Sequence, residues 1–246
     1  VKLLNRTRKG VTVRADAHEL LKHVENMDVH ASALEDAVVS GSAGATQLVR
    51  VATMEGLASQ YVAHRLPLLQ QFDAGVMLEL VSIPQTVDLS RKEADVFLSF
   101  FNPRAPGLTS KRVGSVAMHL YCSPAYVQRR GEPRTLAELA QHHFVGYIEE
   151  LLTIDAVRWL DDVVESPRMV FYSNSILAQC NAAIGGLGIV MLPTFVASGA
   201  HGLQRLFPDV SVKRDVWLSV RAEQSHLSRI RAVTKFFSHI FEMDRE

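Results

Sequence analysis

The hydrophobic positions near the start of the chain follow a heptad spacing. Apolar side chains recur three and then four positions apart from Ala17 to Val38, which is the spacing of helices that pack along one seam. Asp16 precedes the first turn and Gly41 follows the last, and both are residue types that end helices. We predict a long helix over residues 15–41 that pairs with a second copy. Its seam residues are Ala17, Leu20, Val24, Met27, Ala31, Leu34 and Val38.

An amphipathic helix that packs on its own domain is the alternative. Such a helix carries an apolar stripe wider than two heptad positions. Leu21 and Val39 widen the stripe slightly, so this alternative stays open, although the heptad spacing favours pairing.

Short apolar runs alternate with helical patterns after the glycines at 41 and 44. Strands are predicted at residues 48–53, 76–81 and 95–100, with helices at 56–72 and 87–92 between them. This β-α-β-α-β order is typical of a parallel sheet.

A second unit of the same kind follows the first. A last amphipathic helix is expected at 227–241, with Ile230, Val233, Phe237 and Ile240 on its inner face. The fold class is therefore α/β. The remaining predicted strands are 116–121, 144–147, 169–172, 189–192 and 212–220, and the remaining helices are 136–141, 153–160 and 176–184.

The composition indicates a globular protein. The chain has 246 residues, of which 48% are hydrophobic, and 26 basic residues balance 26 acidic ones. That balance excludes a protein that holds nucleic acid by bulk charge. Cys122 and Cys180 are the only thiols, and no apolar run is long enough for a membrane span or signal peptide. We expect a cytoplasmic protein.

The first fourteen residues are basic and contain no acidic side chain. Val11 and Val13 alternate after Gly10, which predicts a short β-ribbon. The ribbon is either a solvated terminus or a contact to a phosphate backbone, and composition does not choose between them. If the ribbon contacts a phosphate backbone, the candidate residues are Arg6, Arg8 and Lys9.

Sequence motifs of catalysis are missing from the chain. It has no G-x-S-x-G, H-E-x-x-H, P-loop or C-x-x-C motif. The glycines at 185, 186 and 188 follow a predicted helix and precede a strand, so we interpret them as a helix end and a tight turn. His142 and His143 are adjacent on an extended segment and point to opposite faces. We predict no catalytic residue, no metal site and no cofactor.

Polar and aromatic residues follow the carboxyl ends of the predicted strands. Ligands of open α/β sheets bind at this edge. Each residue has a plain alternative as a turn or cap, above all the Ser-Asn-Ser run, which is a natural helix N-cap. The candidate ligand-binding residues are Thr53, Glu55, Ser82, Gln85, Phe100, Tyr147, Glu149, Ser173, Asn174 and Ser175.

The strand ends favour an organic anion as the ligand. Backbone N–H groups at the helix starts after Thr53 and Ser173 are anion donors, and the nearby hydroxyls add hydrogen bonds. Glu55 and Glu149 count against a simple anion, because either would repel a carboxylate and attract an amine.

Several short motifs, in their order along the chain, resemble LysR-type transcriptional regulators. The first of them resembles the wing that ends the DNA-binding domain of that family, although Arg14 and Ala17 stand where the family usually has Thr and Gly. The resemblance covers essentially the whole chain. The motifs are LLNRTRKGVTV at 3–13, RLPLLQQF at 65–72, EADV at 93–96, CSPAY at 122–126, AIGGLGI at 183–189, MLP at 191–193 and VWL at 216–218.

The resemblance implies a domain order. Residues 1–14 are the remnant of a winged helix-turn-helix domain expected upstream of Val1, and residues 15–41 are a linker helix that dimerises. A two-lobed effector domain of the periplasmic-binding-protein type 2 fold follows. Its lobe I is 45–119 with 221–246 and its lobe II is 120–220, so crossovers are expected near His119 and Arg221.

The resemblance also implies a function. A small-molecule effector in the cleft between the lobes alters DNA binding by the full-length protein, which assembles as a dimer or tetramer. The family commonly lines its effector pocket with strand-end residues, which supports Thr53 and Ser82 most directly. A periplasmic solute receptor is the alternative, but it needs a signal peptide and has no use for a heptad helix. An enzyme on this fold needs a nucleophile or a cofactor site, and the sequence contains no motif for either.

Overall fold

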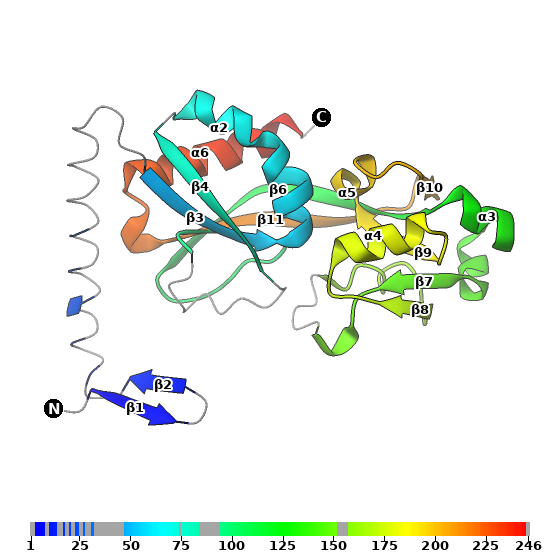
Figure 1. The fold of residues 1–246 in the computed structure, drawn as a ribbon, viewed down its shortest axis with the longest axis horizontal. Coiled ribbons are helices and arrows are strands. Elements are labelled where there is room, and N and C mark those ends of the chain that lie inside the picture. The colour runs from blue at the N-terminus through cyan, green and yellow to red at the C-terminus, as the bar shows by residue number, and fades with distance from the viewer. Residues whose placement is uncertain are drawn as a thin grey trace.

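The computed structural model describes residues 3–7, 10–13, 17, 20, 23–24, 27, 31, 47–73, 75–83, 94–151 and 157–244. Within these ranges, the main sheet has nine strands (Figure 1). Eight of them follow the order β4-β3-β5-β11-β6-β9-β7-β8, and β10 pairs with β6 beside this path.

The first half of the sheet begins with three parallel neighbours. β3 (Gln47–Met54) lies between β4 (Val76–Ile83) and β5 (Val96–Ser99) and pairs in parallel with both. This confirms the three predicted strands. The predicted helix at 56–72 is also present, as three consecutive helical segments: the π-helix η2 (Leu57–Val62), the 3-10 helix η3 (Ala63–Arg65) and the α-helix α2 (Leu66–Phe72). The predicted helix at 87–92 lies outside the described residues.

Two long antiparallel strands connect the halves of the sheet (Figure 1). β6 (Leu108–Cys122) pairs with β11 (Val212–Arg221) through most of its length and with β9 at its end. The sheet is therefore mixed. The sequence predicted only the second part of β6, because its first part is mostly polar or charged, with Thr109, Lys111 and Arg112 exposed.

The chain returns to the first half at the start of β11, and the predicted crossover near Arg221 is wrong. Val212 pairs with Met118, whereas Arg221 pairs with Leu108 at the other end of the same ladder. Residues 217–220 also pair with β5, so this part of β11 belongs to the first half. A strand's apolar pattern shows that it is buried but not which neighbour buries it.

The second half contains another set of parallel pairs. β7 (His143–Gly146) pairs in parallel with β8 (Arg168–Tyr172) and with β9 (Ile189–Pro193), as predicted. The predicted helix at 176–184 is confirmed as α4 (Ile176–Ile184). The sequence missed short elements whose patterns are too brief to register: α3 (Pro124–Arg130), α5 (Thr194–Ser198) and β10 (Gln204–Leu206). The predicted helix at 136–141 is confirmed as the 3-10 helix η4 (Leu136–Gln141), and the other short 3-10 helices are η5 (Glu149–Leu151) and η7 (Ala222–Gln224).

Of the predicted helix at 153–160 the structure describes only residues 157–160, and residue 157 is 3-10 helical, but the helix does not continue to residue 160. Residues 159–163 form turns, and residues 152–156 lie outside the described ranges. Trp159 is buried and packs edge-to-face on aromatic rings of both halves of the sheet. Its large side chain is held by these tertiary contacts, which a periodicity argument does not include.

The glycine cluster after α4 forms the predicted helix end and turn. The N–H of Leu187 donates to the carbonyl of Ala182 at 3.0 Å, and Gly186 adopts φ +82° in the left-handed region. Gly188 then passes close to β7, where a Cβ atom would lie 2.8 Å from the carbonyl oxygen of His143.

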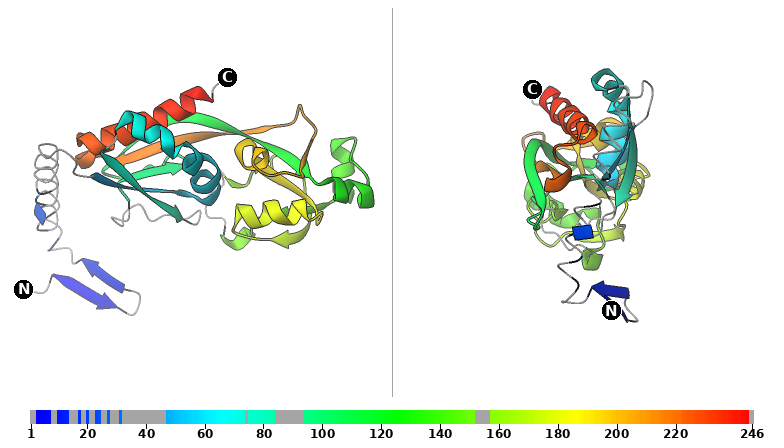
Figure 2. Two further views of the ribbon diagram at one scale, coloured as in Figure 1. Left: turned by 45° about the horizontal axis from the view of Figure 1, so that its top comes forward. Right: turned by 90° about the vertical axis from the view of Figure 1, so that its left-hand side faces the viewer.

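The last helix, α6 (Ser228–Met243), buries the predicted face against the first half of the sheet (Figure 2). The ring of Phe241 stacks on Tyr61 of η2 at a centroid distance of 4.5 Å. The hydroxyl of Tyr61 also donates to the carbonyl of Ile240 at 3.1 Å. The face buried in α6 is Ile230, Val233, Phe236, Phe237, Ile240 and Phe241.

The N-terminal ribbon is confirmed as an antiparallel hairpin of β1 (Leu4–Thr7) and β2 (Gly10–Val13). Positions 20, 23–24, 27 and 31 are helical, while Arg8, Lys9 and the seam residues Leu34 and Val38 lie outside the described residues. Of the described seam residues, Ala17 is buried, and the larger side chains are exposed in the single chain: Leu20 by 48%, Val24 by 52% and Met27 by 70%.

Candidate ligand-binding site

A small crevice lies between the two halves of the sheet. Its cavity volume is about 30 Å³, enough for a water molecule or an ammonium group. The residues that line it follow β3 and β5 on one side and β7, β8 and β9 on the other. They are Met54, Glu55, Gly56, Leu57 and Phe100 from the first half, with Tyr147, Trp159, Asn174, Ile176, Pro193 and Phe195 from the second.

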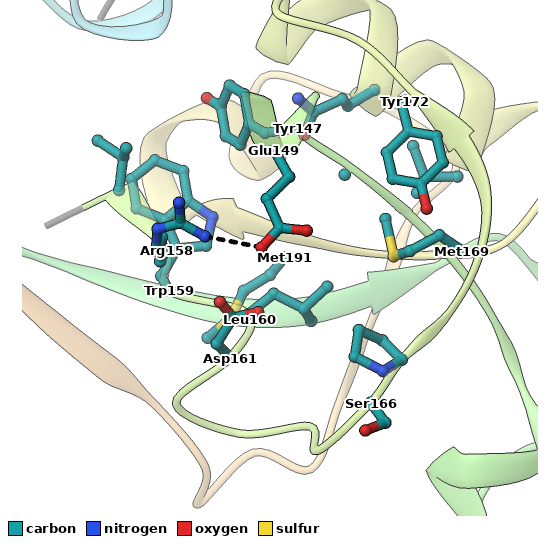
Figure 3. A pocket seen from close by; sticks show the side chains of 15 residues that line it. Tyr147, Glu149, Arg158, Trp159, Leu160, Asp161, Ser166, Met169, Tyr172 and Met191 are labelled. Carbon is teal, nitrogen blue, oxygen red and sulfur yellow. Dashed lines mark hydrogen bonds and ion pairs between the residues drawn. The ribbon is translucent and has the colours of Figure 1, made fainter. Parts of the chain in front are cut away.

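A larger cavity of about 350 Å³ adjoins this crevice in the second half (Figure 3). Tyr147 and Trp159 line both cavities, so they form a shared wall. The volume is within the range of small-molecule sites. Its other lining residues are Val145, Gly146, Glu149, Val157, Arg158, Leu160, Asp161, Ser166, Pro167, Met169, Tyr172, Gln179 and Met191.

Glu55 connects the two sides of the crevice. Its Oε1 accepts a hydrogen bond of 3.0 Å from Oγ of Ser175. The same Oγ accepts from the N–H of Ala178 at 3.1 Å and thereby caps α4. The carboxylate of Glu55 therefore lies beside the N-cap of α4, near the position where the sequence placed a bound anion.

The second carboxylate oxygen of Glu55 accepts no hydrogen bond from the described residues. Oε2 is buried and has no hydrogen-bond partner among the residues that the structure describes. A buried acceptor without a donor is unfavourable, since it has lost its hydration and gained nothing in return.

Three aromatic side chains line the crevice beside Glu55. Trp159 packs edge-to-face on Phe100 at a centroid distance of 5.9 Å and on Tyr147 at 5.6 Å. Phe100 follows β5, Tyr147 follows β7 and Trp159 lies in the turn before β8, so the group draws on both halves. We call Phe100, Tyr147 and Trp159 the aromatic wall.

Charged groups of the larger cavity are dominated by carboxylates. Nη1 of Arg158 lies 3.1 Å from Oε1 of Glu149 (Figure 3), and Glu149 is largely exposed. Exposed ion pairs are weak, so a ligand can replace one at little cost. With Asp161 and Glu55, the described residues around both cavities carry three carboxylates and one guanidinium group.

Five predicted ligand-binding residues line a cavity. Glu55, Phe100, Tyr147 and Asn174 line the crevice, Tyr147 also lines the larger cavity, and Glu149 lines the larger cavity. The rule that ligands bind at the carboxyl ends of the strands therefore selects cavity residues from both halves.

The other five predicted residues are not among the described lining residues of either cavity. Thr53 is fully buried, and its hydroxyl donates to the carbonyl of Leu98 at 3.0 Å. Ser82 is exposed near the end of β4, and Gln85 lies outside the described residues. Ser173 and Ser175 make the cap of α4, as the plain alternative stated, although Ser175 also holds Glu55.

Sequence reasoning missed lining residues in turns, in strand interiors and in α4. Trp159 and Arg158 were assigned to a helix, and Gln179 and Met191 carried no signal at all. The one usable signal was the lone Trp159, since a large amphipathic ring is often found at a binding surface.

The thiols and the buried histidines lie outside these cavities. Burial raises the pKa of Cys122 to about 12 and also raises the pKa of Cys180, so neither thiol is a ready nucleophile. Burial lowers the pKa of His142, whose Nδ1 lies 2.9 Å from the hydroxyl of Tyr126. Within the described ranges, no three His, Cys, Asp or Glu side chains gather as a metal site, and no helix is long and apolar enough to cross a membrane.

Comparison with known protein families gives one match across most of the chain. Residues 42–241 match the family described as the LysR substrate binding domain. This range includes both cavities and both halves of the sheet.

Relatives among curated proteins are transcriptional regulators. An uncharacterized HTH-type transcriptional regulator of Haemophilus influenzae is 26% identical over 145 residues, which are 57% of this chain and 49% of that protein. The regulator YhjC of Escherichia coli is 23% identical over 237 residues, or 93% of this chain and 75% of YhjC. The chain thus spans about half of the first relative and three quarters of the second.

Solved structures show the same fold. The regulatory domain of CrgA, a LysR-type transcriptional regulator from Neisseria meningitidis, aligns with a TM-score of 0.68 and 20% identity over 79% of this chain and 98% of that domain. The structure of CrgA also aligns with a TM-score of 0.68, at 19% identity over 98% of this chain and 84% of CrgA.

Proposed function

Because this chain belongs to the LysR family of transcriptional regulators, we propose that it is the effector-binding and oligomerisation part of a ligand-responsive regulator. A small molecule binds between the two halves and alters DNA binding by the full-length protein in the cytoplasm. This is the two-lobed, periplasmic-binding-protein-like fold of LysR effector domains.

The hydrogen bond between Glu55 and Ser175 is the observation that carries the proposal. It crosses the crevice, and the aromatic wall beside it also draws on both halves. A ligand seated there contacts both halves at once and has different affinities for open and closed arrangements. That differential affinity is what shifts a conformational equilibrium.

The binding residues that we propose fall into two groups. Glu55, Phe100, Tyr147, Glu149 and Asn174 contact the ligand. Thr53, Ser173 and Ser175 act behind them, through hydrogen bonds that hold the end of β3 and the start of α4. Ser82 and Gln85 stay proposed as effector-binding residues.

Oligomerisation and DNA contact are assigned to the N-terminal segment. The exposed Leu20, Val24 and Met27 support pairing with a second copy, because large apolar side chains on one helical seam gain from burial. We propose that the whole seam, from Ala17 to Val38, forms this contact and that Arg6, Arg8 and Lys9 contact the DNA backbone.

A thermal-shift screen tests the binding function. The screen spans carboxylates, the class expected from the sequence, together with amines, amino acids and neutral alcohols. A ligand at about 100 times its Kd stabilises the folded chain by about 2.7 kcal/mol. We expect a hit whose thermal shift is smaller in Asn174→Ala, which changes the crevice. The shift should be unchanged in Asn102→Ala, which removes an exposed amide on another loop. A hit equally retained in both variants contradicts the site.

A further inference from the structure

We propose that the effector carries a protonated amine and that this amine binds Glu55 in front of the aromatic wall of Phe100, Tyr147 and Trp159. The inference rests on the proposed function, since it names the chemical class that the same crevice binds.

The buried Oε2 of Glu55 would be stabilised by a hydrogen-bond donor from a ligand. Oε1 is already bonded to Ser175, while Oε2 is buried and has no partner among the described residues. An ammonium group supplies N–H donors and no acceptor, so it satisfies Oε2 and neutralises the carboxylate in one contact.

The space and the surroundings fit the same group. The crevice of about 30 Å³ accommodates an ammonium head, and the adjoining cavity of about 350 Å³, which shares Tyr147 and Trp159 with the crevice, is large enough for the rest of a small molecule. Aromatic side chains around a desolvated cation add a favourable interaction with its charge. The wall is built from Trp, Tyr and Phe, which are the three side chains that provide it.

An anionic head group is disfavoured at this position. The start of α4, which attracts negative charge, already holds the carboxylate of Glu55 through Ser175. A second carboxylate in the crevice would lie beside Glu55 in a space of about 30 Å³. The adjoining cavity adds Glu149 and Asp161 against Arg158, which is paired with Glu149.

Binding of small probes, read by the emission of Trp159, tests the proposal. The chain has two tryptophans, so Trp217→Phe leaves Trp159 as the single reporter. The probes are benzylammonium, benzyl alcohol and benzoate, which share a ring and differ in charge, and tetramethylammonium, which has charge but no N–H. Each is titrated against the parent, against Glu55→Gln and against Glu132→Gln, which changes an exposed carboxylate at the far end of the second half.

We expect benzylammonium to bind more tightly than the three other probes. Glu55→Gln should weaken its binding tenfold or more, because a charge-assisted hydrogen bond is lost, while Glu132→Gln leaves it unchanged. Three results would overturn the proposal. The first is tighter binding of benzoate than of benzylammonium, and the second is an equal loss of benzylammonium affinity in Glu55→Gln and Glu132→Gln. The third is no change in Trp159 emission with any probe, which would mean that Oε2 binds water instead. The crevice itself is tested separately, since a hit in the thermal-shift screen that depends on Asn174 supports it whatever the charge of the ligand.

Discussion

Glu55 and Ser175 lie 120 positions apart in the sequence and share a hydrogen bond of 3.0 Å across the crevice. Glu55 follows the last residue of β3, and Ser175 caps α4. One hydroxyl therefore serves the first turn of a helix in the second half and a carboxylate in the first. A ligand that changes this contact acts on both halves together.

Ser175→Ala should cost stability and ligand response together. The substitution removes both the cap of α4 and the hydrogen bond to Glu55. The cap alone contributes about 1 kcal/mol, and at most about 2 kcal/mol, to the free energy of unfolding. We expect a lower midpoint of urea unfolding and a smaller thermal shift with any hit from the screen.

Ser123→Ala is the matched control for that substitution. Ser123 caps α3 through the N–H of Tyr126 and lies away from the crevice. It should lower stability by a similar amount and leave the thermal shift intact. A loss of ligand response in Ser123→Ala as well would show that the effect of Ser175→Ala is only general destabilisation.

Gly188→Ala should destabilise the second half by about 1–3 kcal/mol, because the added methyl would meet the backbone carbonyl of His143 at 2.8 Å. Gly185→Ala is the control, since its Cβ would have no neighbour nearer than 3.5 Å and its φ is −65°. We expect that change to stay within about 0.5 kcal/mol of the parent in urea unfolding. Equal losses in both variants would mean that β7 and β9 do not approach as described.

Stability should fall as pH drops from about 7 towards 5. Burial lowers the pKa of His119 and of His142 below the ordinary value of 6.5, so the unfolded chain binds protons in this window that the folded chain does not. His119→Gln keeps a donor for the carbonyl of Val210, which His119 contacts at 2.9 Å, and removes the titrating ring. Urea unfolding at pH 7.5 and 5.5 should show a smaller loss in this variant, and the same loss as the parent in the exposed control His201→Gln. A parent whose stability does not change between these pH values contradicts the argument.

Leu20→Lys combined with Met27→Lys should dissociate the oligomer. Each large apolar side chain contributes about 1.5–3 kcal/mol when a second copy buries it, and a lysine pair on the seam removes that gain. Light scattering after size-exclusion chromatography measures the mass. Leu136→Lys, at an equally exposed leucine of η4, should leave the mass unchanged. An unaltered mass in the double variant would contradict pairing through this helix.

Local chemistry made much of the fold predictable. The cap at Ser175, the apolar run of β9 and the turn at Gly186 each depend on residues close in sequence, and each lies where it was predicted. The aromatic wall could not be predicted in the same way, because Trp159 takes its position from Phe100 and Tyr147 in distant segments.

The charge preference of the site shows the same limit. The sequence placed hydroxyls and helix N–H groups at the strand ends and therefore favoured an anion. Only the fold shows that Glu55 reaches across to Ser175 and takes that place itself. The alternating polar start of β6 was missed for a related reason, since its pairing with β11 comes from residues about a hundred positions later.

Hydrogen–deuterium exchange with and without a hit from the screen tests the central claim most directly. A ligand between the halves should slow exchange at residues 54–57, after β3, and also at residues 174–177, at the start of α4, with the N-terminal hairpin unchanged. Protection confined to one half, or protection only at segments away from the crevice, would contradict the account.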